Sequence, residues 1–251
     1  MVKRYFIEVS YNGLAYSGFQ SQPNAPTIQF MLEKAMSTVL REQIMLTGSS
    51  RTDAEVHARQ NFFHFDTELE IAEQSVYNIN AVLPPDIAVN SLRRVLPDAH
   101  CRFSAISRQY AYYVYNSKDP FLYLRAYYFP YTLSLEKLLA AAAVVAAQNN
   151  FEHYSKRHSQ VKTCNCTILE SGWSSENGLL VYRVKANRFL RGMVRGLTGT
   201  MLKAGTGKIT LPDFEKSFGV AISGLVDFSV PGYGLFLEEV AYPEKIFRLA
   251  E

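Results

Sequence analysis

The succession of strand-like and helix-like segments is the feature that most constrains the fold of this chain. Near the N-terminus Tyr5, Ile7 and Val9 recur at every second residue, the spacing that turns one face of a strand toward a core. Thr27 then precedes apolar residues at helical spacing over residues 28–39, so we expect a helix that begins at this hydroxyl side chain. Both patterns recur further along the chain, as is typical of α+β proteins.

The expected elements alternate along the sequence. They are strands at residues 43–47, 61–65, 87–92 and 110–115, a helix over residues 134–148, a hairpin around residues 176–178, and a helix over residues 188–202. In the last helix Arg188, Arg191 and Arg195 would share one flank, because residues three and four apart lie on the same face. We therefore predict an α+β fold with a mixed or antiparallel sheet flanked by helices, divided near Ala105 into two α/β parts, residues 1–105 and 106–251.

Composition narrows the class of protein and the cellular compartment that we expect. The chain has 251 residues, 48% hydrophobic and 20% charged, which is ordinary for a folded protein and excludes disorder or coiled coil as its main content. The longest apolar stretch, residues 138–147, is well short of the roughly twenty residues that span a bilayer. No secretory signal follows Lys3 and Arg4, and three cysteines cannot all pair. We therefore expect a cytoplasmic protein with no membrane segment.

The charge is unevenly distributed. The net charge is +3, yet residues 177–212 contain no Asp or Glu and hold seven positive side chains, so the rest of the chain carries 3 − 7 = −4. The seven are Arg183, Lys185, Arg188, Arg191, Arg195, Lys203 and Lys208. A block this one-sided indicates an anionic partner, with nucleic acid first among the candidates, but it is equally compatible with a solvated basic face.

The sharpest local feature is the segment of residues 48–58, in which small residues precede Arg51 and Asp53. A carboxylate beside an arginine stays ionised and is suited to act as a nucleophile rather than as an acid. Spacing alone is also compatible with Asp53 capping a turn and Arg51 being its surface partner.

This segment resembles a known family. The run Arg51-Thr52-Asp53-Ala54-x-Val56-His57-Ala58 is similar to the signature of the TruA family of tRNA pseudouridine synthases. Six blocks in family order carry the resemblance over more than two hundred residues: residues 11–22, 27–35, 51–58, 80–89, 103–112 and 187–195, followed by the late motif at 234–237. Phe19 stands where the family usually has Trp.

The resemblance implies the pseudouridine synthase fold, two α/β subdomains facing a basic cleft, and the isomerisation of uridine to pseudouridine at nucleotides 38–40 of the tRNA anticodon stem-loop. It also implies a homodimer, with tRNA as the partner and with no cofactor or metal. By position, Asp53 would be the nucleophile, Tyr110 would lie against the uracil and remove its C5 proton, and Arg195 would pair with Asp53. Arg51 would fill the gap left by the extruded nucleotide. Leu235 would pack beside the base, and Arg188 and Arg191 would bind substrate.

One position departs from the family pattern. Glu55 occupies a place where the family nearly always has glycine, two residues from Asp53. A positive φ there would cost a non-glycine residue roughly 1–3 kcal/mol. An inward carboxylate would raise the pKa of Asp53, whereas an outward one would be expected to pair with Arg59.

Three alternatives remain at this level. Glu55 leaves open an RNA-binding protein of the same fold that has lost turnover, and the Asp53 motif alone also suits a small-molecule hydrolase with an aspartyl nucleophile. A zinc site at Cys164 and Cys166 with His153 and His158 is disfavoured, because a second cysteine pair at finger spacing is missing.

Overall fold

The computed structural model describes residues 1–72, 74–156 and 162–247. It contains strands and helices at most of the positions that the sequence predicts. The chain forms two units. Unit 1 comprises Met1–Ile106 and Leu237–Glu251, and unit 2 comprises Ser107–Phe236. The first boundary lies close to the one expected near Ala105, while the segment from Leu237 onward, expected in the second part, belongs to unit 1.

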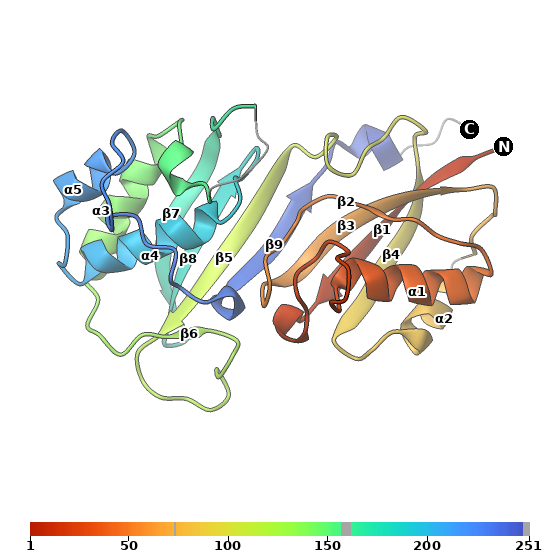
Figure 1. Cartoon of the computed structure of the whole chain (residues 1–251), viewed down its shortest axis with the longest axis horizontal. Coiled ribbons are helices and arrows are strands. Elements are labelled where there is room, and N and C mark those ends of the chain that lie inside the picture. The colour runs from red at the N-terminus through yellow and green to blue at the C-terminus, as the bar shows by residue number, and fades with distance from the viewer. Residues whose placement is uncertain (73, 157–161, 248–251) are drawn as a thin grey trace. The chain divides into compact units, whose positions relative to one another are not determined.

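Unit 1 is built on a sheet with the strand order β4-β1-β3-β9, in which β1 pairs antiparallel with both β3 and β4. Its strands are β1 (Lys3–Tyr11), β2 (Thr47–Gly48), β3 (His57–Thr67), β4 (Ile87–Val95) and, from Leu237 on, β9 (Leu235–Ala241). The helices are α1 (Ile28–Leu40) and α2 (Gln74–Val82), with the 3-10 turns η1 (Gly13–Ala15) and η4 (Glu244–Phe247). Helices α1 and α2 lie side by side on one face of the sheet (Figure 1).

Helix α1 begins as the sequence predicts. The Thr27 side chain accepts a hydrogen bond from the backbone N–H of Phe30, and the helix buries Leu32 and Met36 completely. Strand β1 is covered on both faces, since neighbouring Phe6 and Ile7 are both buried. The core of unit 1 therefore has a layer on each side of its central strand.

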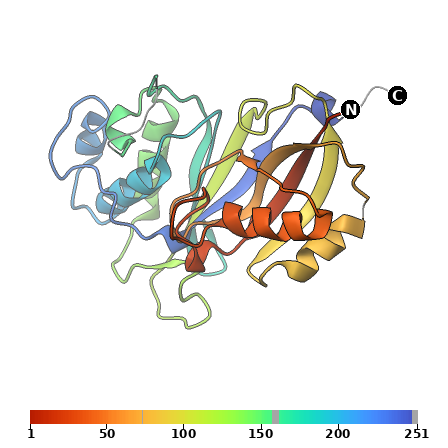
Figure 2. The same ribbon diagram turned by 45° about the vertical axis from the view of Figure 1, so that its right-hand side comes forward.

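Unit 2 holds an antiparallel sheet with the order β5-β8-β7, to which a short parallel strand, β6, is added at β5. Its strands are β5 (Ser107–Tyr115), β6 (Tyr127–Tyr128), β7 (Ile168–Glu176) and β8 (Leu179–Ala186). Its helices are α3 (Leu135–Ala146), α4 (Met193–Gly205) and α5 (Leu211–Lys216), with the 3-10 turns η2 (Glu152–Tyr154) and η3 (Gly232–Gly234). Figure 2 shows these helices gathered on one face of the unit 2 sheet. The Ser134 cap of α3 and the hairpin between β7 and β8 are confirmed.

Two predicted elements are wrong. The strand expected at residues 43–47 is reduced to Thr47–Gly48. The helix expected from Arg188 begins only at Met193, because Gly192 adopts a left-handed backbone with φ of 74° and interrupts the helical run. Arg188 and Arg191 therefore precede α4, and only Arg195 lies on it, so the three arginines do not share one helix face. None of the helices in the described part of the chain is both long and apolar enough to cross a membrane.

Candidate active-site residues

The Asp53 segment is a loop between β2 and β3 of unit 1, held at several points by backbone hydrogen bonds. The N–H of Ser49 donates to the carbonyl oxygen of Phe62 at 2.8 Å, and the N–H of Phe19 donates to that of Thr52 at 3.2 Å. Within the loop the N–H of Val56 donates to the carbonyl of Asp53 at 3.3 Å. The loop is thus tied both to its own strand and to the segment that leads into α1.

A network of buried polar side chains also holds this loop in place. The hydroxyl groups of Tyr11 and Thr52 lie 2.9 Å apart, and the amide nitrogen of Asn61 donates to the Tyr11 hydroxyl at 3.1 Å and to the carbonyl of Ser50 at 3.0 Å. Asn61 is fully buried. Because an unsatisfied buried polar group is costly, this network fixes the residues on both sides of Arg51.

Two glycines let the neighbouring chain approach the loop closely. Gly18 has a φ of 99°, and a Cβ there would lie 3.1 Å from the carbonyl oxygen of Thr52. A Cβ on Gly13 would lie 2.0 Å from the carbonyl oxygen of Val56, which no side chain tolerates. The first loop of the sequence therefore serves as a backbone support for the Asp53 segment.

The side chains of the loop are placed differently. Arg51 is exposed and Asp53 is half-buried. Glu55 has a φ of 67°, so the position does require the backbone that favours glycine. The expected pairing of Glu55 with Arg59 is wrong: Arg59 lies on β3 and its Nε binds Glu238 at 3.2 Å, and no ion pair joins Glu55 to Arg59 among the described residues.

Tyr110 lies in the middle of β5 in unit 2. Its ring packs edge-on against Phe189, with ring centroids 5.0 Å apart and planes at 85°, and only 8% of the residue is exposed. Asn187 lies two residues before Phe189. Its carbonyl accepts a hydrogen bond from Arg108 at 3.1 Å, and its side chain accepts one from the N–H of Thr167 at 2.9 Å. The segment before α4 is thereby fixed beside the tyrosine.

Arg195 lies in the first turn of α4, and its Nε donates to the carbonyl of Val230 at 2.9 Å. This contact depends on two glycines of the helix. A Cβ on Gly196 would lie 2.7 Å from the ring of Phe228, and one on Gly199 would lie 2.3 Å from the carbonyl oxygen of Asp227. The segment 227–230 can therefore lie directly on α4 and orient the guanidinium group.

Leu235 follows η3 and is 6% exposed. The Tyr112 ring lies under this turn, because a Cβ on Gly234 would come within 2.6 Å of it, and the Tyr112 hydroxyl donates to the carbonyl of Pro231 at 2.8 Å. Tyr112 thus packs beneath the turn that carries Leu235.

The basic block is only partly a free positive surface. Arg183 forms a bidentate ion pair with Glu176, which lowers the pKa of that carboxyl to about 2, and Lys203 lies 3.8 Å from Asp227. Arg188 is half-buried and Arg191 is exposed. Arg188 and Arg191 therefore contribute positive charge in the segment that precedes α4.

The predicted residues fall into two groups. Arg51 and Asp53 belong to unit 1, whereas Tyr110, Arg188, Arg191, Arg195 and Leu235 belong to unit 2. Sequence reasoning missed Asn61 and its network. The only signal was a polar residue inside a run of aromatic ones, which does not reveal its partners.

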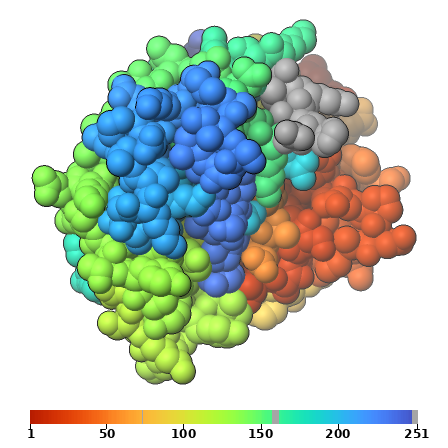
Figure 3. Space-filling view, turned by 60° about the vertical axis from the view of Figure 1, so that its left-hand side comes forward, coloured from red at the N-terminus to blue at the C-terminus, as the bar shows by residue number. Residues whose placement is uncertain are grey.

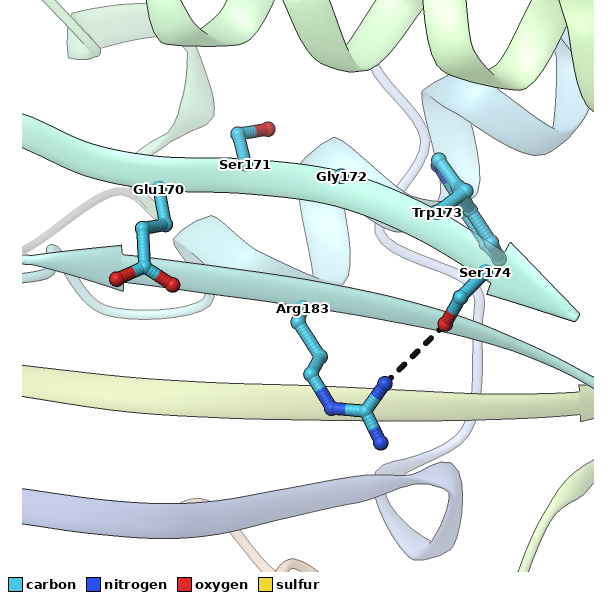
Figure 4. A pocket seen from close by; sticks show the side chains of 6 residues that line it. All are labelled: Glu170, Ser171, Gly172, Trp173, Ser174 and Arg183. Atoms are coloured by element: carbon cyan, nitrogen blue, oxygen red, sulfur yellow. Dashed lines mark hydrogen bonds between the residues drawn. The ribbon is translucent and has the colours of Figure 1, made fainter. Parts of the chain in front are cut away.

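Two further features lie outside these groups. A shallow hollow of about 450 Å³ in unit 2 is lined by β7 and β8, where Glu170, Ser174 and Arg183 point to the same side of the sheet (Figure 4). The segment between β5 and β6 carries Phe121 and Tyr123, which are 85% and 69% exposed, and it forms a projecting lobe of the surface in Figure 3. Exposed aromatic rings of this kind can stack on unpaired bases.

Comparison with known proteins defines the class. A family model described as "tRNA pseudouridine synthase" matches residues 141–243. Similar proteins are tRNA pseudouridine synthase A of Parabacteroides distasonis, 41% identical with all of both chains covered, and that of Porphyromonas gingivalis, 40% identical over 97% of this chain and 99% of the relative. The enzyme of the same name from Bacillus subtilis is 36% identical over 93% of this chain and 97% of the relative.

The chain belongs to the tRNA pseudouridine synthase A family. It is therefore an isomerase, and its α+β architecture is the one that the family resemblance implied.

Proposed function

We propose that this enzyme isomerises uridine to pseudouridine at nucleotides 38–40 of the tRNA anticodon stem-loop, with Asp53 as the nucleophile acting on a flipped-out base. The observation that carries the proposal is the placement of Asp53 on a loop fastened by the Asn61–Tyr11–Thr52 network. Such rigid support is what a reacting group requires.

The reaction needs no cofactor, because it only rearranges bonds. The bond between N1 of uracil and C1′ breaks, the base turns, C5 bonds to C1′, and the proton on C5 is lost while N1 gains one. In this scheme Asp53 attacks the ring or assists departure of the base from C1′, and Tyr110 removes the C5 proton. Proton transfer of this kind contributes on the order of 10²–10⁴ in rate.

Arg195 pairs with Asp53 in the proposed catalytic arrangement and orients the carboxylate. Its Nε is held by Val230, and the terminal nitrogens of a guanidinium group present donors suited to a carboxylate. Leu235 packs beside the uracil. Arg51, exposed on the same loop as Asp53, occupies the space left by the extruded nucleotide and offsets an unstacking cost of a few kcal/mol.

Arg188 and Arg191 bind tRNA phosphates, and a cytoplasmic homodimer binds one tRNA in this proposal. The positive segment before α4 supports the phosphate role, since anions are favoured at a helix N-terminus. Binding should therefore weaken steeply as salt rises.

The test is to incubate the protein with an unmodified tRNA transcript and to map pseudouridine by chemical derivatisation. We expect product at nucleotides 38–40 and at no other uridine. Product elsewhere would reject the assigned position, and tight binding without product would support the RNA-binding alternative. Affinity insensitive to salt would favour the small-molecule hydrolase.

A further inference from the structure

A cluster of soft metal-ligating side chains lies in unit 1 outside the residues assigned to the isomerase. His64 lies on β3, and His100 and Cys101 lie in the turn that follows β4. One ligand atom from each of the three side chains lies within 4.8 Å of the other two. A strand and a turn that are distant in sequence thus bring three donors to one point.

The distances are close to those of a metal site. Nδ1 of His64 lies 3.1 Å from Sγ of Cys101, and the rings of His64 and His100 have centroids 4.5 Å apart. Zinc bonds of about 2.3 Å to sulfur and about 2.0–2.1 Å to nitrogen place those two atoms about 3.5 Å apart in a tetrahedron. For one ion to bind all three donors, these two atoms would separate by a few tenths of an ångström, and donor atoms that lie up to 4.8 Å apart would approach by about 1 Å.

The donors have the right chemistry. Two imidazoles and a thiolate suit zinc or a similar borderline-soft ion rather than magnesium or calcium. Cys101 is fully buried, whereas His100 is only half-buried, which leaves an approach from solvent.

Two arginines, Arg4 and Arg102, lie near the cluster. Arg4 donates to the carbonyl of Ala99 at 3.0 Å, but its guanidinium is neutralised by a bidentate ion pair with Asp66 at 2.7 and 2.6 Å. A bound cation would therefore face Arg4, which is paired, and Arg102, which is exposed to solvent.

The ion would displace a hydrogen bond at each donor atom, including the one that Nδ1 of His64 accepts from the backbone N–H of Cys101 at 3.4 Å. The thiol of Cys101 donates to the carbonyl of Thr47 at 3.1 Å, and this proton would be released when the thiolate binds metal. Nδ1 of His100 accepts a hydrogen bond from the N–H of Arg102 at 3.1 Å. If His100 coordinates through Nδ1 it cannot keep that bond, but the N–H belongs to an exposed residue and can bind water instead.

We propose that His64, His100 and Cys101 bind one zinc ion, with water as the fourth ligand. The ion joins β3 to the turn after β4 and stabilises unit 1. It takes no part in the isomerisation, so the proposal is independent of the assigned function.

The test titrates the metal-free full chain with Zn²⁺ and, as a spectroscopic probe, Co²⁺. We expect one equivalent of Zn²⁺ to bind, a melting temperature that rises with Zn²⁺ concentration, and a thiolate-to-cobalt absorption band. Release of about one proton per zinc should accompany binding at neutral pH.

Two variants and a control make the result specific. His100→Asn, at a half-buried position, should fold and weaken zinc binding about tenfold or more, and Cys101→Ser should abolish the cobalt band. Cys166→Ser is the matched control, because Cys166 is also buried, with a pKa raised to about 11 by burial, and should leave both readouts unchanged. Less than one equivalent of bound metal in the wild type, or a cobalt band that survives in the folded His100→Asn variant at equal affinity, would overturn the proposal.

Discussion

The loop that carries Asp53 and the segment that carries Arg188 and Arg191 are held in different ways. The loop rests on a buried side-chain network and on glycines that let backbone approach backbone. The arginine segment is irregular, with an exposed Arg191 and a left-handed Gly192 before α4. We infer that the first region fixes a reacting group within narrow limits, whereas the second can adjust to the phosphates of a long RNA.

Substitution of Arg195 should lower the rate of the chemical step more than any substitution in the segment that carries Arg188 and Arg191. Arg195→Ala should lower kcat on the order of 10²–10³-fold, because the charged partner proposed to orient Asp53 is removed. Arg195→Lys should recover only part of this loss, because an ammonium group lacks the fork geometry of guanidinium. Single-turnover rates on a tRNA transcript give the measurement, and a normal rate for Arg195→Ala would contradict the proposed pair.

The next largest effect is expected from breaking the buried hydrogen-bond network of Asn61, Tyr11 and Thr52. Asn61→Leu leaves the carbonyl of Ser50 and the hydroxyl of Tyr11 without their amide donor, which should cost about 1–3 kcal/mol in the free energy of unfolding. It should also lower kcat with little change in KM, since the loop would lose its support. Asn78→Leu, at an exposed position on α2, is the control. Equal denaturation midpoints and rates for the two variants would show that the network is dispensable.

Substitutions in the segment that carries Arg188 and Arg191 should weaken tRNA binding and leave the rate of the chemical step nearly unchanged. The double substitution Arg188→Ala and Arg191→Ala should raise KM and reduce the slope of log affinity against log salt by about one for each phosphate that is no longer neutralised. The single-turnover rate at saturating tRNA should stay near that of the wild type. Lys216→Ala serves as the control for charge alone, and an unchanged salt slope in the double variant would remove these arginines from the interface.

Glu55 tests whether the loop stores strain. Glu55→Gly should raise the free energy of unfolding by about 1 kcal/mol, because the φ of 67° costs glycine little. Turnover should change little if the carboxylate stays away from Asp53. A large gain in kcat would mean instead that Glu55 impairs the nucleophile.

The smallest effect is expected on the melting temperature at acidic pH. The pKa of Glu176, lowered to about 2 by Arg183, lies below its ordinary value of 4.5, so the pair stabilises the folded protein above pH 4.5 and this contribution is lost as the pH falls toward 2. Glu176→Gln should slightly reduce the fall in melting temperature between about pH 5 and pH 3, while Glu170→Gln on the same strand should not. The effect is small because both partners are partly exposed.

Local signals accounted for much of the fold. The caps at Thr27 and Ser134, the hairpin at Asn177 and Gly178, and the aromatic strand at Tyr110 all depend on neighbours in sequence. The start of α4 was not predicted, because the apolar spacing continues across residues 190–194 and hides the left-handed Gly192.

Long-range placement could not be predicted in the same way. The return of the chain to unit 1 at Leu237 depends on pairing with a distant strand. Asn61 and Cys101 gave no sign of their partners, because alternation shows that a residue is buried but not what it contacts. The roles proposed for Asp53 and Tyr110 came from the family motif rather than from spacing.

The most direct measurement is pseudouridine formation by Asp53→Asn under single-turnover conditions, beside Asp98→Asn as a carboxylate control elsewhere in unit 1. The account predicts that Asp53→Asn folds, binds tRNA with nearly normal affinity and loses on the order of 10³-fold or more in rate, while the control is unaffected. Product formed at the wild-type rate by Asp53→Asn would contradict it.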